Sequence, residues 1–299
     1  MNHDFPEYAF PLAPEFAALY AERFERGRER MRKSRVIFAG LVRNAIDVLP
    51  LTIERIERLA NGFADHRIVV YENDSTDGTQ ELLTAWAAAM PKVSVVSESL
   101  GAPLNPNTRS SSRADRMAAC RNRYHALIAK RFAGFDCVIV LDMDVPGGWS
   151  EDGIANTFGC DNWDFVGSNG IILQRVHLRF NTYLHYDAWA YRQYGSYEPM
   201  PAPIVNNFGW QRGEPLVSVF SCFGGIGIYR MPAFLSAQYA GSDCEHVALH
   251  RGMRDAGYGR QFLNPSQLVF YGRKVKTLEG VVKLYNSVRS TYTGEQLPA

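Results

Sequence analysis

The sequence predicts a single α/β domain in which helices flank a mostly parallel central sheet. Two features of the chain indicate this fold class. From residue 35 onward, apolar runs of strand length alternate with segments of helical periodicity, which is the order of β–α–β units. Polar residues follow several of these apolar runs, at the positions where open α/β sheets bind their ligands. A chain of 299 residues can bury one large core of this kind.

The predicted elements follow a regular order. The first residues stand apart, because 13–33 has the periodicity of one helix whose second half is rich in arginine. We expect strands at 35–41, 68–71, 93–96 and 138–144, and helices at about 51–60, 79–90 and 113–131. After residue 149 the chain becomes rich in aromatic residues. We divide it into a basic helical extension, 1–34, and two halves of one domain, 35–148 and 149–299.

The composition is that of an ordinary soluble protein. The formal net charge is +1, so the chain has no basic field that would attract nucleic acid. The five cysteines are odd in number and include no Cys-x-x-Cys pair, which indicates a reducing compartment rather than a disulfide framework or a zinc site. No apolar run is long enough to span a membrane, and the first residues lack the apolar core of a signal peptide. We expect a cytoplasmic protein without a nucleic-acid partner.

Five arginines lie in the second half of the first predicted helix, with glutamates among them. Such a charge run is usually the solvated face of a helix that packs against its domain. The alternative is contact with an anionic membrane surface or a partner through residues 13–35, which would place the protein at the inner membrane surface. The sequence leaves both interpretations open.

Asp142 and Asp144 lie at the end of the apolar run that begins at Val138, one residue apart. Side chains at i and i+2 of a strand point to the same face, so the two carboxylates would converge at the end of the strand. Convergent carboxylates suit a hard divalent cation, and such a cation suits a diphosphate. The pattern therefore predicts Mn²⁺ or Mg²⁺ on Asp144 and Asp142.

Residues 72–79 connect a predicted strand to the next helix. Glu72 and Asp74 can hydrogen-bond a base and a ribose there, although the same turn can simply cap the helix. Arg121 lies on the predicted helix 113–131, before the acidic pair, and can fold back beside it. Guanidinium groups neutralise a diphosphate leaving group well, so we expect Arg121 to stabilise its charge.

Two later segments carry further candidates. Gly224 and Gly225 lie in a glycine-rich turn without the signature of a P-loop or a dinucleotide fold, and they either let the backbone approach a sugar or form a structural bulge. Glu245 begins a predicted helix on which His246 and His250 share a face. The histidines do not fit the His-Glu-x-x-His zinc pattern. A base, or one histidine such as His250 that completes the metal shell, fits better.

These motifs resemble the glycosyltransferases of the GT-A fold, over about residues 35–272. Residues 72–79 resemble the Asp-Asp-Gly-Ser-Thr-Asp-Gly-Thr turn of that class, 141–144 its Asp-x-Asp strand, and 245–258 its Glu-Asp helix ending in Ala-Gly-Tyr. His246 departs from the pattern, because many members carry the proposed aspartate base there, and Asn44 replaces a frequent glutamate. Other details are similar to the fungal capsule-associated α-1,3-mannosyltransferase group: Glu-Asn-Asp-Ser at 72–75, Arg-Asn at 121–122, Tyr-Asp-Ala-Trp at 186–189 and Cys-Glu-His-Val at 244–247.

The resemblance implies a metal-dependent hexosyltransferase with a Rossmann-like GT-A sheet. The nucleotide sugar would bind to the half 35–148, and the acceptor to the half 149–299. The fungal group further implies a retaining α-mannosyltransferase of polysaccharide biosynthesis, which moves mannose from GDP-mannose to a saccharide or lipid-linked acceptor.

The resemblance also implies roles for single residues. Glu72 and Asp74 would contact the nucleoside, and Asp187 would line the sugar together with the two glycines of the later turn. Glu245 or His246 would orient the acceptor hydroxyl and, in an inverting reaction, act as general base. In a retaining reaction the departing phosphate can take that proton instead, and the sequence does not decide between the two.

Three other functions stay open. A UDP-sugar-dependent glycosyltransferase would share these motifs. A nucleotidyltransferase also uses paired carboxylates and magnesium, but it needs a glycine-rich loop after the first strand, and 39–43 is poor in glycine. A non-catalytic glycan-binding module would suit the aromatic residues after 149, whereas the intact Asp142 and Asp144 favour an enzyme.

Overall fold

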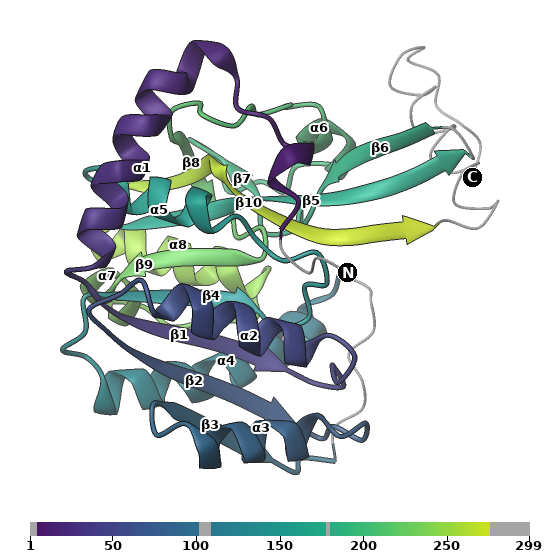
Figure 1. Ribbon diagram of the computed structural model, residues 1–299. Coiled ribbons are helices and arrows are strands. Elements are labelled where there is room, and N and C mark those ends of the chain that lie inside the picture. Colours follow the sequence, from purple (N-terminus) through teal and green to yellow (C-terminus); the bar gives the residue numbers. More distant parts are fainter. Residues whose placement is uncertain (1–4, 102–108, 178–179, 276–299) are drawn as a thin grey trace, which may run out of the picture.

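The computed structural model describes residues 5–101, 109–177 and 180–275 (Figure 1). The strands are β1 (Arg35–Val42), β2 (Asp65–Asn73), β3 (Val93–Glu98), β4 (Cys137–Asp142), β5 (Phe165–His177), β6 (Phe180–His185), β7 (Arg192–Gln193), β8 (Val217–Ser221), β9 (Ile226–Arg230) and β10 (Gln261–Val275). The α-helices are α1 (Ala17–Met31), α2 (Leu49–Ala60), α3 (Thr79–Ala89), α4 (Ser111–Arg131), α5 (Glu151–Gly159), α6 (Ala202–Asn206), α7 (Met231–Leu235) and α8 (Glu245–Asp255). Two short 3₁₀ turns, Glu7–Ala9 and Pro14–Phe16, precede α1. The ends of the predicted division, 1–4 and 276–299, lie outside the described residues.

The strands form one sheet in the order β3-β2-β1-β4-β9-β5-β10-β8-β7, with β6 paired to β5. β3, β2, β1 and β4 are parallel, and β9 is antiparallel to both β4 and β5. In the second half β5 and β10 are parallel, while β6, β7 and β8 add antiparallel pairs. The predicted fold class, an α/β domain with a central sheet and flanking helices, is confirmed. Because β1, β2 and β4 are parallel, their carboxyl ends meet at one edge.

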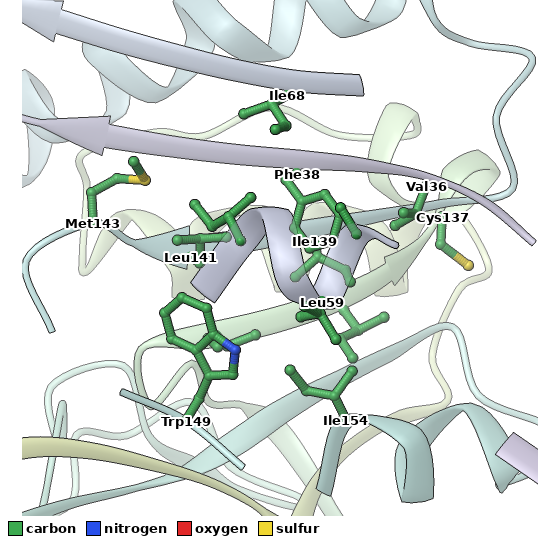
Figure 2. Close-up of a cluster of buried hydrophobic side chains, with 14 of the residues drawn as sticks. Val36, Phe38, Leu59, Ile68, Cys137, Ile139, Leu141, Met143, Trp149 and Ile154 are labelled. Carbon is green, nitrogen blue, oxygen red and sulfur yellow. The ribbon is translucent and has the colours of Figure 1, made fainter. Parts of the chain in front are cut away.

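The sheet is buried on both faces, which explains the near-continuous apolar runs of its strands. Side chains alternate along β1: Val36 and Phe38 belong to one core cluster, and Ile37 and Ala39 to the other. The first cluster includes residues of α2, α3 and α5, and Figure 2 draws part of it. The second includes residues of α4, α7 and α8. The helices therefore cover both faces of the sheet.

Helix α1 lies beside α5 (Figure 1), and its arginines bind the carboxyl end of that helix. Arg26 Nε donates to the carbonyl oxygen of Gly159 at 2.7 Å, and Arg30 Nη1 donates to those of Phe158 and Cys160. Cations are favoured at this end, where the last carbonyls of a helix lack partners. These contacts support the interpretation of a surface helix packed on its domain. Among the described residues, no helix is long and apolar enough to cross a membrane.

The crossing of α1 and α5 depends on two glycines. A Cβ atom at Gly27 would lie 1.7 Å from the carbonyl oxygen of Ala155, and one at Gly159 would lie 1.8 Å from that of Arg23. We expect Gly27→Ala to lower the free energy of unfolding by about 1–3 kcal/mol, because the two backbones must separate. Urea denaturation would measure the loss. Gly134→Ala is the matched control, since a Cβ there has nothing within 4 Å, and an equal loss in both variants would contradict the prediction.

Candidate active site

A cavity of about 340 Å³ lies at the edge where β1, β2 and β4 end, beside α4 and the start of α8. Its lining combines apolar side chains with an unusual number of charges. Four carboxylates face it, those of Asp142, Asp144, Asp187 and Glu245. Four arginines face it as well, and these are Arg43, Arg113, Arg116 and Arg121. The cavity can therefore hold a ligand that carries both negative charge and hydroxyl groups.

Arg121 connects two of the predicted site residues. It is buried on α4, and its Nε donates to Glu245 Oε1 at 3.1 Å. Its Nη2 lies 3.7 Å from Asp142 Oδ1, and its Nη1 donates to the hydroxyl of Tyr124 at 3.3 Å. One ion-pair network thus joins Arg121, Asp142 and Glu245. Asp142 lies 21 positions after Arg121 in the sequence, and Glu245 lies 103 positions after Asp142. This part of the predicted site is brought together at the cavity.

The two aspartates come from different elements. β4 ends at Asp142, two residues before the predicted end of the strand, so Asp144 belongs to the turn that follows. Both still line the cavity. Burial, and the negative charge of Asp144, raise the pKa of Asp142. Burial also raises the pKa of Asp144. Two acids held this close are costly to ionise without a cation.

Tyr186 lines the cavity, although no chemical role was predicted for it from the sequence. Its hydroxyl donates to Asp142 Oδ2 at 2.8 Å, and its ring stacks on Tyr271 with the centroids 4.6 Å apart. Asp187, the next residue, has φ of 62° and also lines the cavity. Burial and the charges of Asp142 and Glu245 raise the pKa of Asp187 to about 8. The only signal in the sequence was the Tyr-Asp-Ala-Trp string at 186–189.

The two histidines of α8 have different surroundings. His246 lines the cavity and stacks on Phe223 with the centroids 3.8 Å apart. In the part of the chain that the structure describes, neither ring nitrogen has a hydrogen-bond partner. Burial, followed by the charge of Arg121, lowers the pKa of His246, so its ring is neutral. His250 lies one turn further along, with Nδ1 2.8 Å from Ser221 Oγ and Nε2 3.0 Å from the hydroxyl of Tyr229. It does not line the cavity, and we do not retain it as a metal ligand.

The two acidic side chains predicted in the turn at 72–79 do not face the cavity. Both oxygens of Glu72 accept local hydrogen bonds, from the amide of Ser75 and from Ser97 Oγ. Asp74 Oδ1 accepts from the amides of Leu100 and Gly101. Neither acid lines the cavity, whereas Asn73 between them does. Glu72 and Asp74 therefore shape the turn, and Asn73 is the residue between them that faces the cavity.

Gly224 and Gly225 do not line the cavity either. Both have positive φ, of 64° and 93°. A Cβ at Gly224 would lie 2.2 Å from the carbonyl oxygen of Ser168, and one at Gly225 would lie 3.3 Å from the ring of Tyr186. The carbonyl oxygen of Gly225 accepts from the amide of Asp142 at 2.9 Å. The glycines thus support the residues of the site, and the alternative of a structural role is the one that fits.

The acidic residues fit a divalent cation with incomplete protein ligation. Among the described residues there is no group of three or more His, Cys, Asp or Glu side chains arranged to hold a metal ion. Asp142 and Asp144 provide two carboxylates at the cavity, both with raised pKa. Mg²⁺ is commonly held by one or two carboxylates together with water and phosphate oxygens, which is the donor set that this cavity could offer.

Comparisons with known proteins give similarities of fold. No family model and no curated protein matches the sequence. A mannosyltransferase from Pyrobaculum calidifontis, solved in complex with GDP-Man and Mn²⁺, is 13% identical with a TM-score of 0.46, over 86% of this chain and 66% of that chain. A glucosyl-3-phosphoglycerate synthase from Mycobacterium tuberculosis, solved in complex with UDP, is 15% identical with a TM-score of 0.45, over 90% of this chain and 82% of that chain. The function proposed below rests on the residues of the cavity.

Proposed function

We propose that the protein is a metal-dependent glycosyltransferase that transfers a sugar from a nucleotide sugar to a saccharide or lipid-linked acceptor. The observation that carries this proposal is the convergence of Asp142, Asp144, Arg121 and Glu245 on one cavity at the carboxyl ends of parallel strands. A nucleoside diphosphate sugar needs both signs of charge around it: cations for the phosphates, and carboxylates for a metal ion and for sugar hydroxyls. The cavity offers both.

In this proposal Asp142 and Asp144 hold Mn²⁺ or Mg²⁺. When bound, the ion would neutralise the diphosphate and stabilise the charge that develops on the leaving group. Tyr186 keeps Asp142 oriented through its hydroxyl. Arg121 holds Glu245 at the cavity and adds a fixed positive charge close to Asp142. Removing one such preorganised electrostatic contact typically costs about 3–4 kcal/mol of barrier.

Glu245 and His246 are the residues that we assign to the acceptor. Glu245 is buried and paired with Arg121 at the cavity, where one of its oxygens can accept a hydrogen bond from the acceptor hydroxyl. Beside it, His246 has two ring nitrogens without a hydrogen-bond partner among the described residues, and its Nε2 lies 3.9 Å from Glu245 Oε1. The lowered pKa of His246 makes its ring a weak base. We therefore favour Glu245 for orienting, or deprotonating, the hydroxyl and His246 for hydrogen-bonding a sugar.

The donor we favour is GDP-mannose, with retention of configuration. This choice rests on the resemblance of the strings at 72–75, 121–122, 186–189 and 244–247 to the fungal mannosyltransferase group. Residues 186–189 and 244–247 supply six of the residues that line the cavity, so the resemblance is concentrated at the site. Asn73 and Tyr71 at the end of β2 would face the nucleoside.

Residues 13–35 remain a proposed contact with a membrane surface.

A thermal-shift panel of GDP, UDP, CMP and ADP, each with Mn²⁺ and with EDTA, tests the donor. A ligand at 100 times its dissociation constant should stabilise the protein by about 2.7 kcal/mol, which raises Tm by about 5 °C. We expect the largest rise with GDP, and we expect EDTA to abolish it. A metal-dependent rise with UDP instead would keep the transferase and replace the donor. No rise with any nucleotide would favour the glycan-binding module.

A further inference from the structure

Arg192 in β7 joins two segments of the second half, and all five of its N–H groups have partners. Nε donates to the carbonyl oxygen of Tyr197, and Nη1 donates to those of Trp189 and Tyr191, each at 2.8 Å. Nη2 donates to both carboxylate oxygens of Asp243 at 2.7 Å. The arginine side chain is 1% exposed. A guanidinium group that is fully bonded in this way holds its neighbours in one geometry.

The two segments that Arg192 joins both lead into the cavity. On one side, three to six residues before Arg192, lie Tyr186, Asp187 and Trp189, which line it. On the other side, Asp243 lies two residues before α8, and its Oδ1 accepts from the amide of Cys244 at 2.7 Å. Cys244 and Glu245, the first residue of the helix, line the cavity. The ion pair therefore connects the two segments within a few residues of the side chains that line the cavity.

Each segment carries a carboxyl group that faces the cavity, Asp187 on the first and Glu245 on the second. The position of one group relative to the other depends on how the two segments are attached to each other. The bidentate pair of Arg192 and Asp243 is such an attachment, and it touches the cavity at neither end, since neither residue lines it.

We propose that the Arg192–Asp243 ion pair positions the 186–189 segment against the start of α8, and that it thereby sets the acceptor side of the cavity. Both are positioning residues that act through Asp187, Trp189 and Glu245. The inference rests on the proposed glycosyltransferase function, in which Glu245 meets the acceptor and Asp187 lines the sugar. The donor side, with Arg43, Asn73 and Arg116, is built on β1, β2 and α4 and does not depend on the pair.

Asp243→Asn tests the proposal, because it keeps the shape of the side chain and the three carbonyl contacts of Arg192. We expect amide hydrogen exchange in 186–197 to become about tenfold faster, since one charge-assisted hydrogen bond is lost. Exchange in 137–142 should not change. With GDP-mannose and methyl α-D-mannoside, we expect KM for the acceptor to rise and kcat/KM to fall about 10- to 100-fold. The Kd of the Mn²⁺–GDP complex, measured by calorimetry, should stay within about threefold, because its phosphate and base contacts remain.

Glu151→Gln is the matched control, since Glu151 on α5 forms an ion pair of the same 2.7 Å length with Arg58 on α2, and neither residue lines the cavity. It should change neither exchange in 186–197 nor the acceptor KM. Unchanged exchange and kinetics in Asp243→Asn would overturn the proposal, and so would equal losses of nucleotide and acceptor binding. If the wild-type protein neither binds nucleotide nor transfers sugar, the proposed function fails, and the exchange experiment alone then decides whether the ion pair holds the two segments together.

Discussion

Asp144→Asn should reduce sugar transfer by at least about 100-fold while the binding of the acceptor saccharide survives. Asparagine keeps the size of the side chain and removes one negative charge from the cavity, where Asp144 and Asp142 together would hold the cation. Initial rates measured from the released nucleoside diphosphate, and acceptor affinity measured by calorimetry, give the two quantities separately. The same variant distinguishes an enzyme from a glycan-binding module, whose affinity for saccharide would be its whole function.

The matched control for this variant is Asp255→Asn. Asp255 is an exposed aspartate at the end of α8, outside the lining of the cavity, so the substitution removes the same charge from the protein surface. Its rate should equal that of the wild-type protein. A wild-type rate in Asp144→Asn as well would remove Asp144 from the mechanism.

Arg121→Met should destabilise the protein by about 3–5 kcal/mol, because it leaves Glu245 buried and without its cation. The side chains of Arg121 and Glu245 are 4% and 5% exposed, so water cannot replace the lost partner. Urea denaturation at pH 7.5 measures the change in the free energy of unfolding. The double variant Arg121→Met/Glu245→Met should recover part of the loss, since no unpaired carboxylate is then left in the interior.

Arg123→Met provides the comparison on the same helix. Arg123 Nε lies 3.2 Å from Glu98 Oε2, but its side chain is 57% exposed. An exposed pair contributes little, and we expect a change of less than about 1 kcal/mol. Equal destabilisation by Arg121→Met and Arg123→Met would mean that the buried network does not stabilise the fold.

Local patterns in the sequence were sufficient for the order of the elements from α1 to β4, whereas most elements after residue 149 were not predicted. The apolar runs of β1 and β4 are buried on both faces, which is the situation in which a strand loses its polar alternation and becomes easy to detect. Asp142 and Glu245 were also found from the sequence, since each lies at an element end beside the cavity, and Arg121 was found as an arginine on the helix that precedes the acidic pair. The predicted end of β4 was wrong by two residues, because no local signal distinguishes a strand end from the turn that follows.

Roles that depend on the surroundings of a side chain were predicted less well. His246 and His250 share one face of α8, and their ring centroids are 6.1 Å apart. One helical turn separates a histidine at the cavity from one enclosed by Ser221 and Tyr229. Glu72 likewise looked available in the sequence, yet its two oxygens accept hydrogen bonds within the turn and from β3.

The sequence by itself determined the α/β architecture, the two-sided core and the acidic and basic residues that can meet at the ends of the parallel strands. It did so because strand and helix periodicity and burial are encoded within a few neighbouring residues. Only the tertiary structure decided that Tyr186 binds Asp142, 44 positions away, and that Arg192 binds Asp243, 51 positions away. Such contacts depend on which distant segments the fold brings together, and the spacing of neighbouring residues does not specify this.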